Sequence, residues 1–364
     1  MGVEKRLRCL GWRDSKKETK FEERKRSKKK GMVTKMKTRL SVIIPVFNTA
    51  PFLNKCINSV LSQSFEDFEL ICVDNYSTDG SSDILRECAK KDSRVKYHIP
   101  ERHGRATETR QFGLQLASGE FITFVDSDDS VKPGMYKHMF SQQENHCADI
   151  VVCNFDMVYP DRVKPEYSDM RDEVIDLKAT GYQHYFNEYF CMTRPNNYLW
   201  SRIIRRSIAV ENEIEFQPVD ISEDTIFSML CTAFAKRVVH ISNSYYNYFQ
   251  RDDSAMRVTI RSRNIADSYV YAFDCVERYV NTHGLRKMFT DILPVYAATR
   301  VRSIMFYMNL VGRDDSIMRN SLEFALRGSS ITAYLRRAVS ENLIDNKELI
   351  DTVRNMFKLL EMTV

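Results

Sequence analysis

The segment from Gly119 to Asp129, GEFITFVDSDD, limits the possible folds of this chain more than any other segment. Phe121–Val125 is a run of aromatic and β-branched residues, which is typical of a strand buried on both faces of a parallel sheet. Asp126, Asp128 and Asp129 follow it, and open α/β sheets bind their ligands at the carboxyl ends of strands. Because three close carboxylates repel each other, the segment predicts a bound cation, such as Mg²⁺ carrying a substrate phosphate. The alternative is a solvated turn, since Asp and Ser are ordinary turn residues.

Short buried strands alternate with helical segments in the first part of the chain. Strands are predicted at Leu40–Pro45, Leu70–Val73, Val95–Ile99 and Phe121–Val125, and helices from Pro51, over about Ser81–Lys91 and over Gly104–Leu116. This alternation indicates βαβ units with right-handed crossovers. We therefore expect an α/β fold with a Rossmann-like, mostly parallel sheet flanked by helices.

Acidic residues, rather than glycine-rich loops, end the predicted strands. Asp74 follows the second strand and Asp126 the fourth, while GxGxxG does not follow the first strand and GxxxxGK[ST] does not occur. These absences argue against a dinucleotide oxidoreductase and a P-loop enzyme. The pattern indicates a nucleotide-binding type of sheet with carboxylates at two strand ends.

The composition is that of an ordinary globular protein. The 364 residues are enough for one large or two modest domains. The nine cysteines are scattered and form no CxxC pair, so we expect reduced thiols in a cytoplasmic protein, without disulfide or zinc. No apolar run reaches the roughly eighteen residues of a membrane span, and no signal peptide precedes the first strand.

The first 38 residues carry the basic character of the chain. They hold fifteen Lys or Arg against five Asp or Glu, and the run around Lys25–Lys30 lacks hydrophobic periodicity, which is typical of a disordered tail. One interpretation is peripheral attraction to anionic lipid head groups. A nucleic-acid arm is the second, although no folded nucleic-acid module accompanies it and no nucleic-acid partner is expected. The third is that translation starts at Met32 or Met36.

Several linked motifs resemble those of family 2 glycosyltransferases. They read IIPVFN, VDNYSTDGS and TRQFGLQLASGEFITFVDSDD, and the likeness continues through NYLWSRIIRR, SEDTIF and YYNYFQRDDS, over about residues 40 to 255. The similarity is to bacterial members that build surface polysaccharides. It implies the GT-A fold and the transfer of a sugar, usually from a UDP-sugar, to a hydroxyl with inversion at the anomeric carbon.

The resemblance assigns the acidic strand end to the metal and the phosphates. Asp126, Ser127 and Asp128 match the DxD motif, which implies Mn²⁺ or Mg²⁺ held by Asp128 and Asp126 on the diphosphate of the donor. Arg110 matches a basic residue near the diphosphate, and Arg105 lies just over one helical turn before it. The alternative for both arginines is an exposed helix cation.

The resemblance also implies a nucleoside pocket at the first two strand ends. Pro45, Phe47 and Asn48 match the loop that lines the pocket, and Asp74 matches the position that holds the base. A carboxylate can accept a hydrogen bond from the base N–H. The alternatives are a turn cap for Asp74 and plain packing for Phe47.

The catalytic base is expected at the start of a helix over Glu223–Ala235. Asp224 matches the position that serves as base in relatives, and Glu223 precedes it. The alternative is a pair of first-turn acids that complement the helix dipole. Trp200 is assigned to the sugar site, because aromatic rings suit sugar C–H faces, and core packing is its alternative. Asp129 is also assigned to the sugar or the acceptor.

Some positions depart from the family pattern. Asn75 and Tyr76 stand where Asp and Gly are common, and Gln111 and His103 stand where Asn is common. These departures affect the expected nucleoside contacts and leave the metal ligands and the base in place.

Three regions are expected along the chain: residues 1–38 as the basic tail, 39–255 as the GT-A domain and 256–364 as a helical region. Apolar residues at spacings of three and four predict amphipathic helices there, over Ser268–Val280, Leu285–Leu310, Ile317–Leu326 and Glu348–Leu360. These helices are expected to pack on the sheet; the alternatives are closure over the acceptor site and contact with a membrane.

The expected function is assembly of cell-surface polysaccharide from a nucleotide-diphosphate sugar and a glycan or lipid-linked acceptor, at the inner face of the cytoplasmic membrane. A sugar nucleotidyltransferase is a rival, but it would need a glycine-rich phosphate loop after the first strand. A catalytically silent scaffold docked by its basic tail is the other rival. The presence of Asp126, Asp128 and Asp224 weighs against it.

Overall fold

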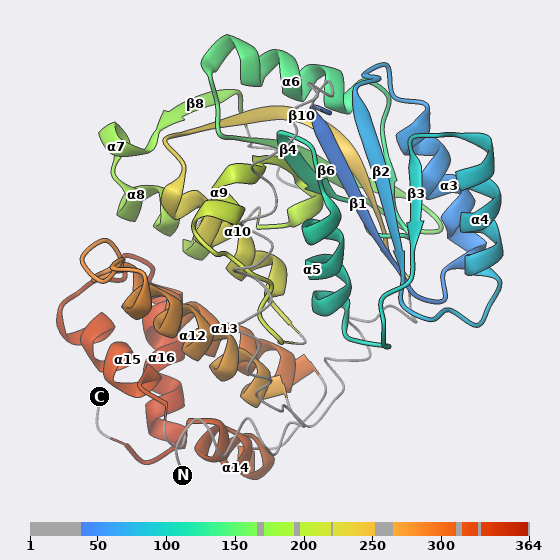
Figure 1. Ribbon diagram of the computed structural model, residues 1–364. Coiled ribbons are helices and arrows are strands. Elements are labelled where there is room, and N and C mark those ends of the chain that lie inside the picture. Colours follow the sequence, from blue (N-terminus) through green and yellow to red (C-terminus); the bar gives the residue numbers. More distant parts are fainter. Residues whose placement is uncertain are drawn as a thin grey trace, which may run out of the picture.

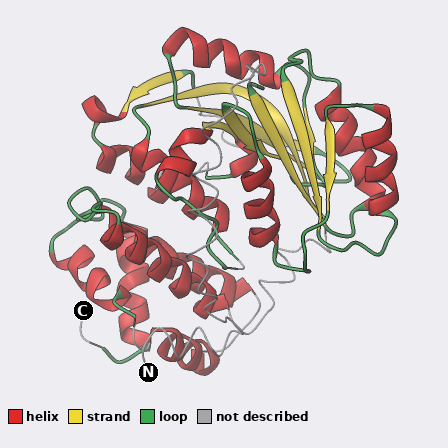
Figure 2. Ribbon diagram, viewed as in Figure 1, coloured by secondary structure: helices red, strands yellow, loops and turns green. Residues whose placement is uncertain are grey.

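The computed structural model describes residues 38–165, 171–192, 197–219, 221–251, 265–310, 315–326 and 329–362. All of the predicted basic tail except Thr38 lies outside these ranges. A large sheet with helices on both faces forms one part of the molecule, and the helices after residue 264 form a second part beside it (Figures 1 and 2).

The predicted βαβ order is present in the first part of the chain. Its elements are β1 (Leu40–Val46), α3 (Ala50–Leu61), β2 (Phe68–Asp74), α4 (Ser81–Lys91), β3 (Val95–His98), α5 (Ala106–Leu116) and β4 (Phe121–Phe124). β1 lies between β2 and β4, and β3 joins the outer edge of β2, all in parallel. The ends of β1, β2 and β4 therefore meet at one edge of the sheet, as the sequence predicts.

The second part of the sheet is mixed. Its elements are β5 (Ser130–Val131), α6 (Met135–His146), β6 (Ile150–Val158), β7 (Val163–Pro165), β8 (Glu173–Asp176), α7 (Leu177–Thr180), α8 (Tyr182–Phe186), η1 (Asn187–Met192), η2 (Leu199–Ser201), β9 (Arg202–Arg205), α9 (Arg206–Glu211), α10 (Glu223–Phe234) and β10 (Arg237–Phe249). The strand order is β3-β2-β1-β4-β9-β6-β10-β5. β9 runs antiparallel to both β4 and β6, so the parallel arrangement does not extend across the whole sheet.

Alternate residues of the central strands point to opposite faces of the sheet. Val42 and Ile44 pack in a buried cluster with α3 and α6, whereas Ile43 packs in a second cluster with α5 and α10. α5 lies so close to the sheet that a Cβ atom added at Gly113 would be 2.5 Å from Cγ2 of Ile43. This glycine therefore sets the position of α5, the helix that carries Arg110.

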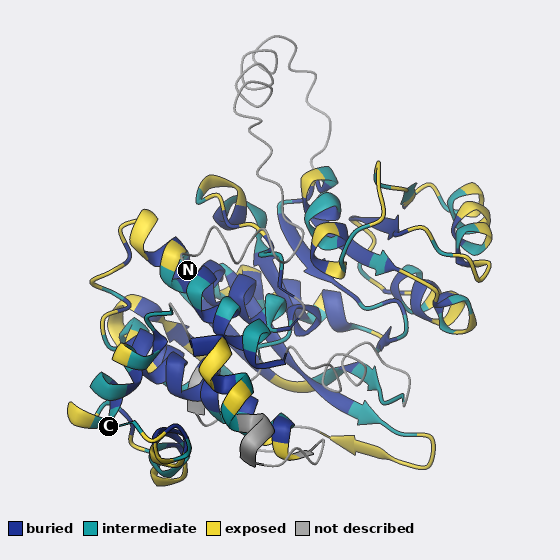
Figure 3. Cartoon of the chain, turned by 90° about the horizontal axis from the view of Figure 1, so that it is seen from below, coloured by how far each residue is buried: buried dark blue, intermediate teal, exposed yellow. Residues whose placement is uncertain are grey.

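The C-terminal helices are α12 (Ile265–Thr282), α13 (Ile292–Leu310), α14 (Asp315–Leu326), α15 (Ile331–Ser340) and α16 (Lys347–Leu359). Four of them correspond to the predicted helices, whereas α15 was not predicted. The first half of α13 is buried on all sides, as expected for a helix at the centre of a bundle. Figure 3 shows that the buried residues continue from the sheet into these helices.

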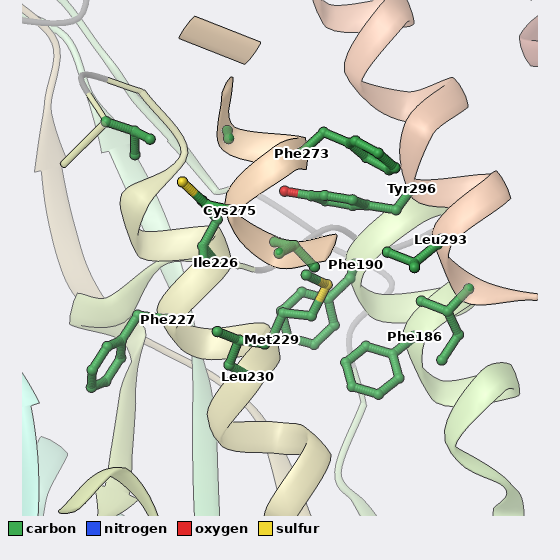
Figure 4. Packing of buried hydrophobic residues seen from close by; sticks show 14 of the residues in the cluster. Phe186, Phe190, Ile226, Phe227, Met229, Leu230, Phe273, Cys275, Leu293 and Tyr296 are labelled. Carbon is green, nitrogen blue, oxygen red and sulfur yellow. The ribbon is translucent and has the colours of Figure 1, made fainter. Parts of the chain in front are cut away.

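Packing on the sheet was expected; among the described residues, the helical region packs chiefly on α10 and η1, the helices that cover the sheet. Phe186, Phe190 and Met229 from α8, η1 and α10 face Phe273 and Leu293 from α12 and α13 (Figure 4). The ring centroids of Phe186 and Phe289 lie 5.5 Å apart. A single apolar cluster therefore joins the helical region to α10.

Two sequence expectations concern composition rather than fold. In the described ranges, no helix combines the length and the apolar character needed to cross a membrane. The seven cysteines whose side chains the structure describes are free thiols, and four of them lie in or beside the sheet and its helices without any exposed surface, namely Cys56, Cys72, Cys153 and Cys231.

Candidate active site

The loops after β1, β2 and β3 are tied to one another. The Asn48 side-chain oxygen accepts a hydrogen bond from the backbone N–H of Thr78 (2.8 Å). The amide of Asn75 donates to the carbonyl of Gly104 (2.7 Å) and accepts from its N–H (2.9 Å). Asn48 and Tyr76 both have positive φ angles, 51° and 64°, and such strained residues cluster at functional sites. The three loops therefore form one connected surface, in which the unusual Asn75 has a structural role.

Three aromatic rings stand at the tips of these loops. Phe47 and Tyr76 are large apolar residues with 49% and 42% of their surface exposed. The ring of His103 contacts both edge-on, with centroids 5.3 Å from Phe47 and 6.5 Å from Tyr76. The Tyr76 hydroxyl donates to the carbonyl of Pro100 (2.9 Å). Phe47 is therefore only partly packed, and two of the departures from the family pattern, Tyr76 and His103, lie near it.

Asp74 faces inward, unlike these rings. It has no exposed surface, and its carboxylate accepts hydrogen bonds from the N–H of Ser77 (2.9 Å) and from the hydroxyls of Ser82 and Tyr97. Such contacts are typical of a turn cap, which is the alternative role of Asp74. A carboxylate that binds a base would instead be presented to the ligand. Pro45 is half-buried at the end of β1, opposite Val73 of β2.

Each of the first two carboxylates after β4 is paired with a different arginine. Asp126 Oδ1 lies 2.7 Å from Nη2 of Arg110, and Asp128 Oδ2 lies 2.7 Å from Nη2 of Arg251. The Ser127 hydroxyl accepts from the hydroxyl of Thr49 (3.0 Å), which fixes the turn to the loop after β1. Burial and the nearby charge of Asp126 raise the pKa of Asp128 above its usual range, and Arg251 opposes that shift. Additional positive charge would therefore be favourable here.

Asp129 and Trp200 do not match their expected roles. The Asp129 carboxylate is buried and accepts from the hydroxyl of Tyr246 and from the N–H of Phe249, both at 2.8 Å. Trp200 is only 5% exposed and stacks on Tyr246, with centroids 4.1 Å apart. Asp129 thus attaches β10 to the end of β4, and Trp200 belongs to the core, so neither side chain is presented to an acceptor.

Glu223 and Asp224 occupy the first turn of α10, and Arg110 connects them to the strand end. Nη1 of Arg110 lies 2.6 Å from Oε1 of Glu223, while its Nη2 contacts Asp126. One guanidinium therefore bridges the two groups of acidic residues that the sequence assigns to the site. These groups are separated by about a hundred residues in the chain and lie together in the fold.

Burial dominates the electrostatics of this turn. It raises the pKa of Glu223 to about 7, with Arg110 opposing the shift and the charge of Asp224 adding to it. Burial also raises the pKa of Asp224, whereas the hydrogen bond from the N–H of Thr225 and the charge of Arg110 lower it. A carboxylate with a raised pKa is a better proton acceptor near neutral pH than an ordinary aspartate.

Sequence reasoning missed three arginines around these carboxylates. Arg251 reaches Asp128 from the end of β10, the buried Arg202 contributes positive charge near Asp224, and Arg300 donates to the hydroxyl of Ser222 (3.0 Å). Arg105, in contrast, was considered and donates to the carbonyl of Pro218 (2.8 Å). Arg251 lies within the YYNYFQRDDS motif, which was the available signal; Arg300 lies in a region without a recognised motif.

Comparison with known proteins identifies the family. Residues 41–209 match the family model described as glycosyl transferase family 2. The protein carries a family 2 glycosyltransferase domain. It is 27% identical to glycosyltransferase GlyG of Streptococcus pneumoniae over 72% of this chain and 89% of that protein. It is 30% identical to the putative glycosyltransferase EpsH of Bacillus subtilis over 57% of this chain and 60% of that protein.

The fold of this glycosyltransferase is also that of a solved structure. S. aureus TarS, crystallised in complex with UDP-GlcNAc, superposes with a TM-score of 0.65 and 21% sequence identity, over 89% of this chain and 90% of that chain. The expected GT-A architecture with a helical C-terminal region is therefore confirmed. The likeness extends into the C-terminal helices, beyond the segment that the family model matches.

The donor atoms at the strand end of the glycosyltransferase domain fit a hard divalent cation. Asp126 and Asp128 both keep part of their side-chain surface exposed, and each gives one carboxylate oxygen to a guanidinium. Among the residues that the structure describes, no group of three or more His, Cys, Asp and Glu is arranged to hold a metal ion. The fit thus depends on two carboxylates, the number that Mg²⁺-like ions commonly take from a protein while phosphate and water fill the other positions.

Proposed function

We propose that this glycosyltransferase transfers a sugar, with inversion, from a nucleotide-diphosphate sugar to a hydroxyl of a glycan or lipid-linked acceptor in cell-surface polysaccharide synthesis. The observation that carries the proposal is that the guanidinium of Arg110 contacts both Asp126, at the strand end, and Glu223, at the start of α10. This proximity supports the proposal, because inverting transfer needs a base on the face of the sugar opposite the departing phosphate, and both groups must then line the same site.

The connected loops would hold the nucleoside. Phe47 and Tyr76 offer exposed rings that can stack on a base, and Pro45 and Asn48 would shape the end of β1 on either side of Phe47. Asp74 would act indirectly, by fixing the turn that carries Tyr76. A UDP-sugar is the simplest donor, in keeping with the UDP-GlcNAc complex of TarS.

The diphosphate would lie beside Asp126, Ser127 and Asp128. A bound Mn²⁺ or Mg²⁺, held by Asp128 and Asp126, would supply positive charge to the diphosphate leaving group. Arg110 lies close enough to add to that charge, since it already contacts Asp126. Arg251 would have to share Asp128 with the ion, because its guanidinium contacts one of the two carboxylate oxygens.

Asp224 would take the proton from the acceptor hydroxyl. Its raised pKa suits a general base, and it lies one residue from the Arg110 contact of Glu223. Glu223, held by Arg110, would orient the first turn of α10. In this proposal α10 carries the base and the end of β4 carries the phosphate site, and Arg110 of α5 contacts a residue of each.

Release of UDP from a panel of UDP-sugars, with and without Mn²⁺, tests the proposal. Slow Mn²⁺-dependent hydrolysis of one donor is expected even without an acceptor. Pyrophosphate-dependent formation of a nucleoside triphosphate would favour a sugar nucleotidyltransferase instead. Donor binding without turnover under any condition would favour a binding module.

The place of action is proposed to be the inner face of the cytoplasmic membrane, with the basic residues 1–38 in peripheral contact with anionic lipid. Flotation of the full chain with anionic liposomes at low salt, and loss of flotation at high salt, is the expected result. Failure to float at low salt would remove this part of the proposal.

A further inference from the structure

The residue that precedes the Glu223–Asp224 pair does not act as an ordinary helix cap. A serine at this position normally accepts a hydrogen bond from an N–H of the first turn. Ser222 makes no such bond and has a φ angle of 65°. Its hydroxyl oxygen accepts a hydrogen bond from Nη1 of Arg300 instead (3.0 Å). The start of the base-bearing helix is thus attached to a residue 78 positions later in the chain.

Arg300 belongs to α13, the central helix of the C-terminal region, and its guanidinium is buried. Arg300 is 7% exposed, and its guanidinium carbon lies 4.7 Å from the ring centre of Tyr296 and 5.6 Å from that of Tyr269. Within the described ranges its Nε has no hydrogen-bond partner. Its guanidinium is bonded to a neutral hydroxyl, and burying a cation against neutral groups costs stability, so packing alone explains the residue poorly.

Residues on either side of Ser222 contact α5. Arg105, at the start of α5, donates to the carbonyl of Pro218 (2.8 Å), and Arg110 contacts Glu223. Pro218 and Glu223 are therefore bonded to α5, and Ser222 is bonded to α13. Burial raises the pKa of Tyr269 of α12, and the negative charge of Asp224 adds to that rise. Tyr269 is therefore near Asp224.

We propose that Arg300 is a positioning residue, through which the C-terminal helices hold Ser222 and thereby fix the direction of Asp224. The inference rests on the proposed function, in which Asp224 is the base. It gives the helical region a defined role in the reaction, because displacement of a base by about 1 Å can cost up to about 100-fold in rate.

Four variants test this role: Arg300→Met, Arg300→Lys, Ser222→Ala and, as a matched control, Arg337→Met. Arg337 lies on α15 and also anchors the helical region, through Asp291 (2.6 Å) and Glu341 (2.8 Å). With UDP-GlcNAc or another UDP-sugar that gives turnover, Arg300→Met and Ser222→Ala should lower kcat by about 10- to 100-fold with the donor KM unchanged. Arg300→Lys should restore part of kcat, and Arg337→Met should leave it unchanged.

Hydrogen exchange supplies a readout that does not need turnover. The N–H of Ile226 donates to the carbonyl of Ser222 (3.0 Å), so its protection reports the position of Ser222. Protection of Ile226 should fall in Arg300→Met and Ser222→Ala, and should be kept in Arg337→Met.

Two results would overturn the proposal. One is wild-type protection of Ile226 in Arg300→Met. The other is a loss of kcat that Arg337→Met reproduces, because that would reflect general destabilisation of the helical region. Absence of turnover in the wild-type protein would contradict the proposed function, while the exchange measurement would still decide whether Arg300 holds the first turn of α10.

Discussion

Two pairs of acidic residues meet at Arg110, and they are built in different ways. Asp126 and Asp128 lie in a turn directly after β4, where both side chains are partly exposed and each is paired with an arginine. Glu223 and Asp224 begin a helix whose other residues are almost all buried, and burial raises both pKa values. The first pair lies in a partly exposed turn, whereas the second lies in the buried first turn of a helix. Substitutions should therefore affect the two sides differently.

The largest effect is expected on the helix side. Asp224→Asn should keep the fold and the donor affinity, while transfer falls by about 10² to 10⁴, because the amide cannot take the acceptor proton. Steady-state rates together with UDP binding by thermal shift measure both quantities. Transfer at nearly the wild-type rate would place the base elsewhere.

The next effect is expected at the strand end. Asp128→Ala should abolish the part of UDP affinity that depends on Mn²⁺ and lower turnover by about 10² to 10³, the scale seen when one group that stabilises developing charge is removed. UDP titrations with Mn²⁺ and with EDTA separate the two contributions. If UDP affinity in this variant still rises with Mn²⁺ as in the wild type, Asp128 is not a metal ligand.

A change in α5 should disturb both sides together. In Gly113→Ala the new Cβ would meet Ile43 at 2.5 Å and Val73 at 3.4 Å, so the helix must move away from the sheet and carry Arg110 with it. We expect a loss of about 1 to 3 kcal/mol in unfolding free energy. Denaturant unfolding measures this change, and combining Gly113→Ala with Ile43→Ala, which makes room for the new Cβ, should cost less than the sum of the two single losses. Additive losses would show that the two side chains do not compete for space.

The smallest effect concerns pH. The pKa of Glu223 is raised from 4.5 to about 7 in the folded protein, so its contribution to stability is present below about pH 4.5 and is lost as pH rises toward 7. Glu223→Gln removes this titration and keeps an acceptor for Arg110. The free energy of unfolding of the variant, minus that of the wild type, should therefore rise by roughly 1 kcal/mol or more between pH 4.5 and 7.5. A difference that does not vary with pH would mean that Glu223 does not titrate in this range.

The same contrast explains how much the sequence revealed. β1, β2, β4, α4 and α10 were predicted to within about two residues, because local hydrophobic patterns determine them. The antiparallel β9 and the short helix α15 were not predicted, since their packing partners are remote. The acidic motifs were found because each is contiguous. The pairing of Asp128 with Arg251 and of Ser222 with Arg300 depends on tertiary structure, and no local pattern encodes it.

The orientation of Asp129 shows the same limit. Three aspartates in four residues look equivalent in the sequence, yet only the third turns inward to Tyr246 and Phe249. The partners of Asp129 are more than a hundred residues away. Position in the motif alone did not distinguish it from Asp126 and Asp128.

The shared use of Arg110 by Asp126 and Glu223 has a thermodynamic consequence. Removing either carboxylate is expected to leave one arm of the guanidinium unpaired and to change its interaction with the remaining partner. Energies measured for the two acids one at a time will therefore not sum to the energy of losing both. A loss of charge at the end of β4 is thus expected to change the electrostatic environment of the first turn of α10, without any movement of the sheet.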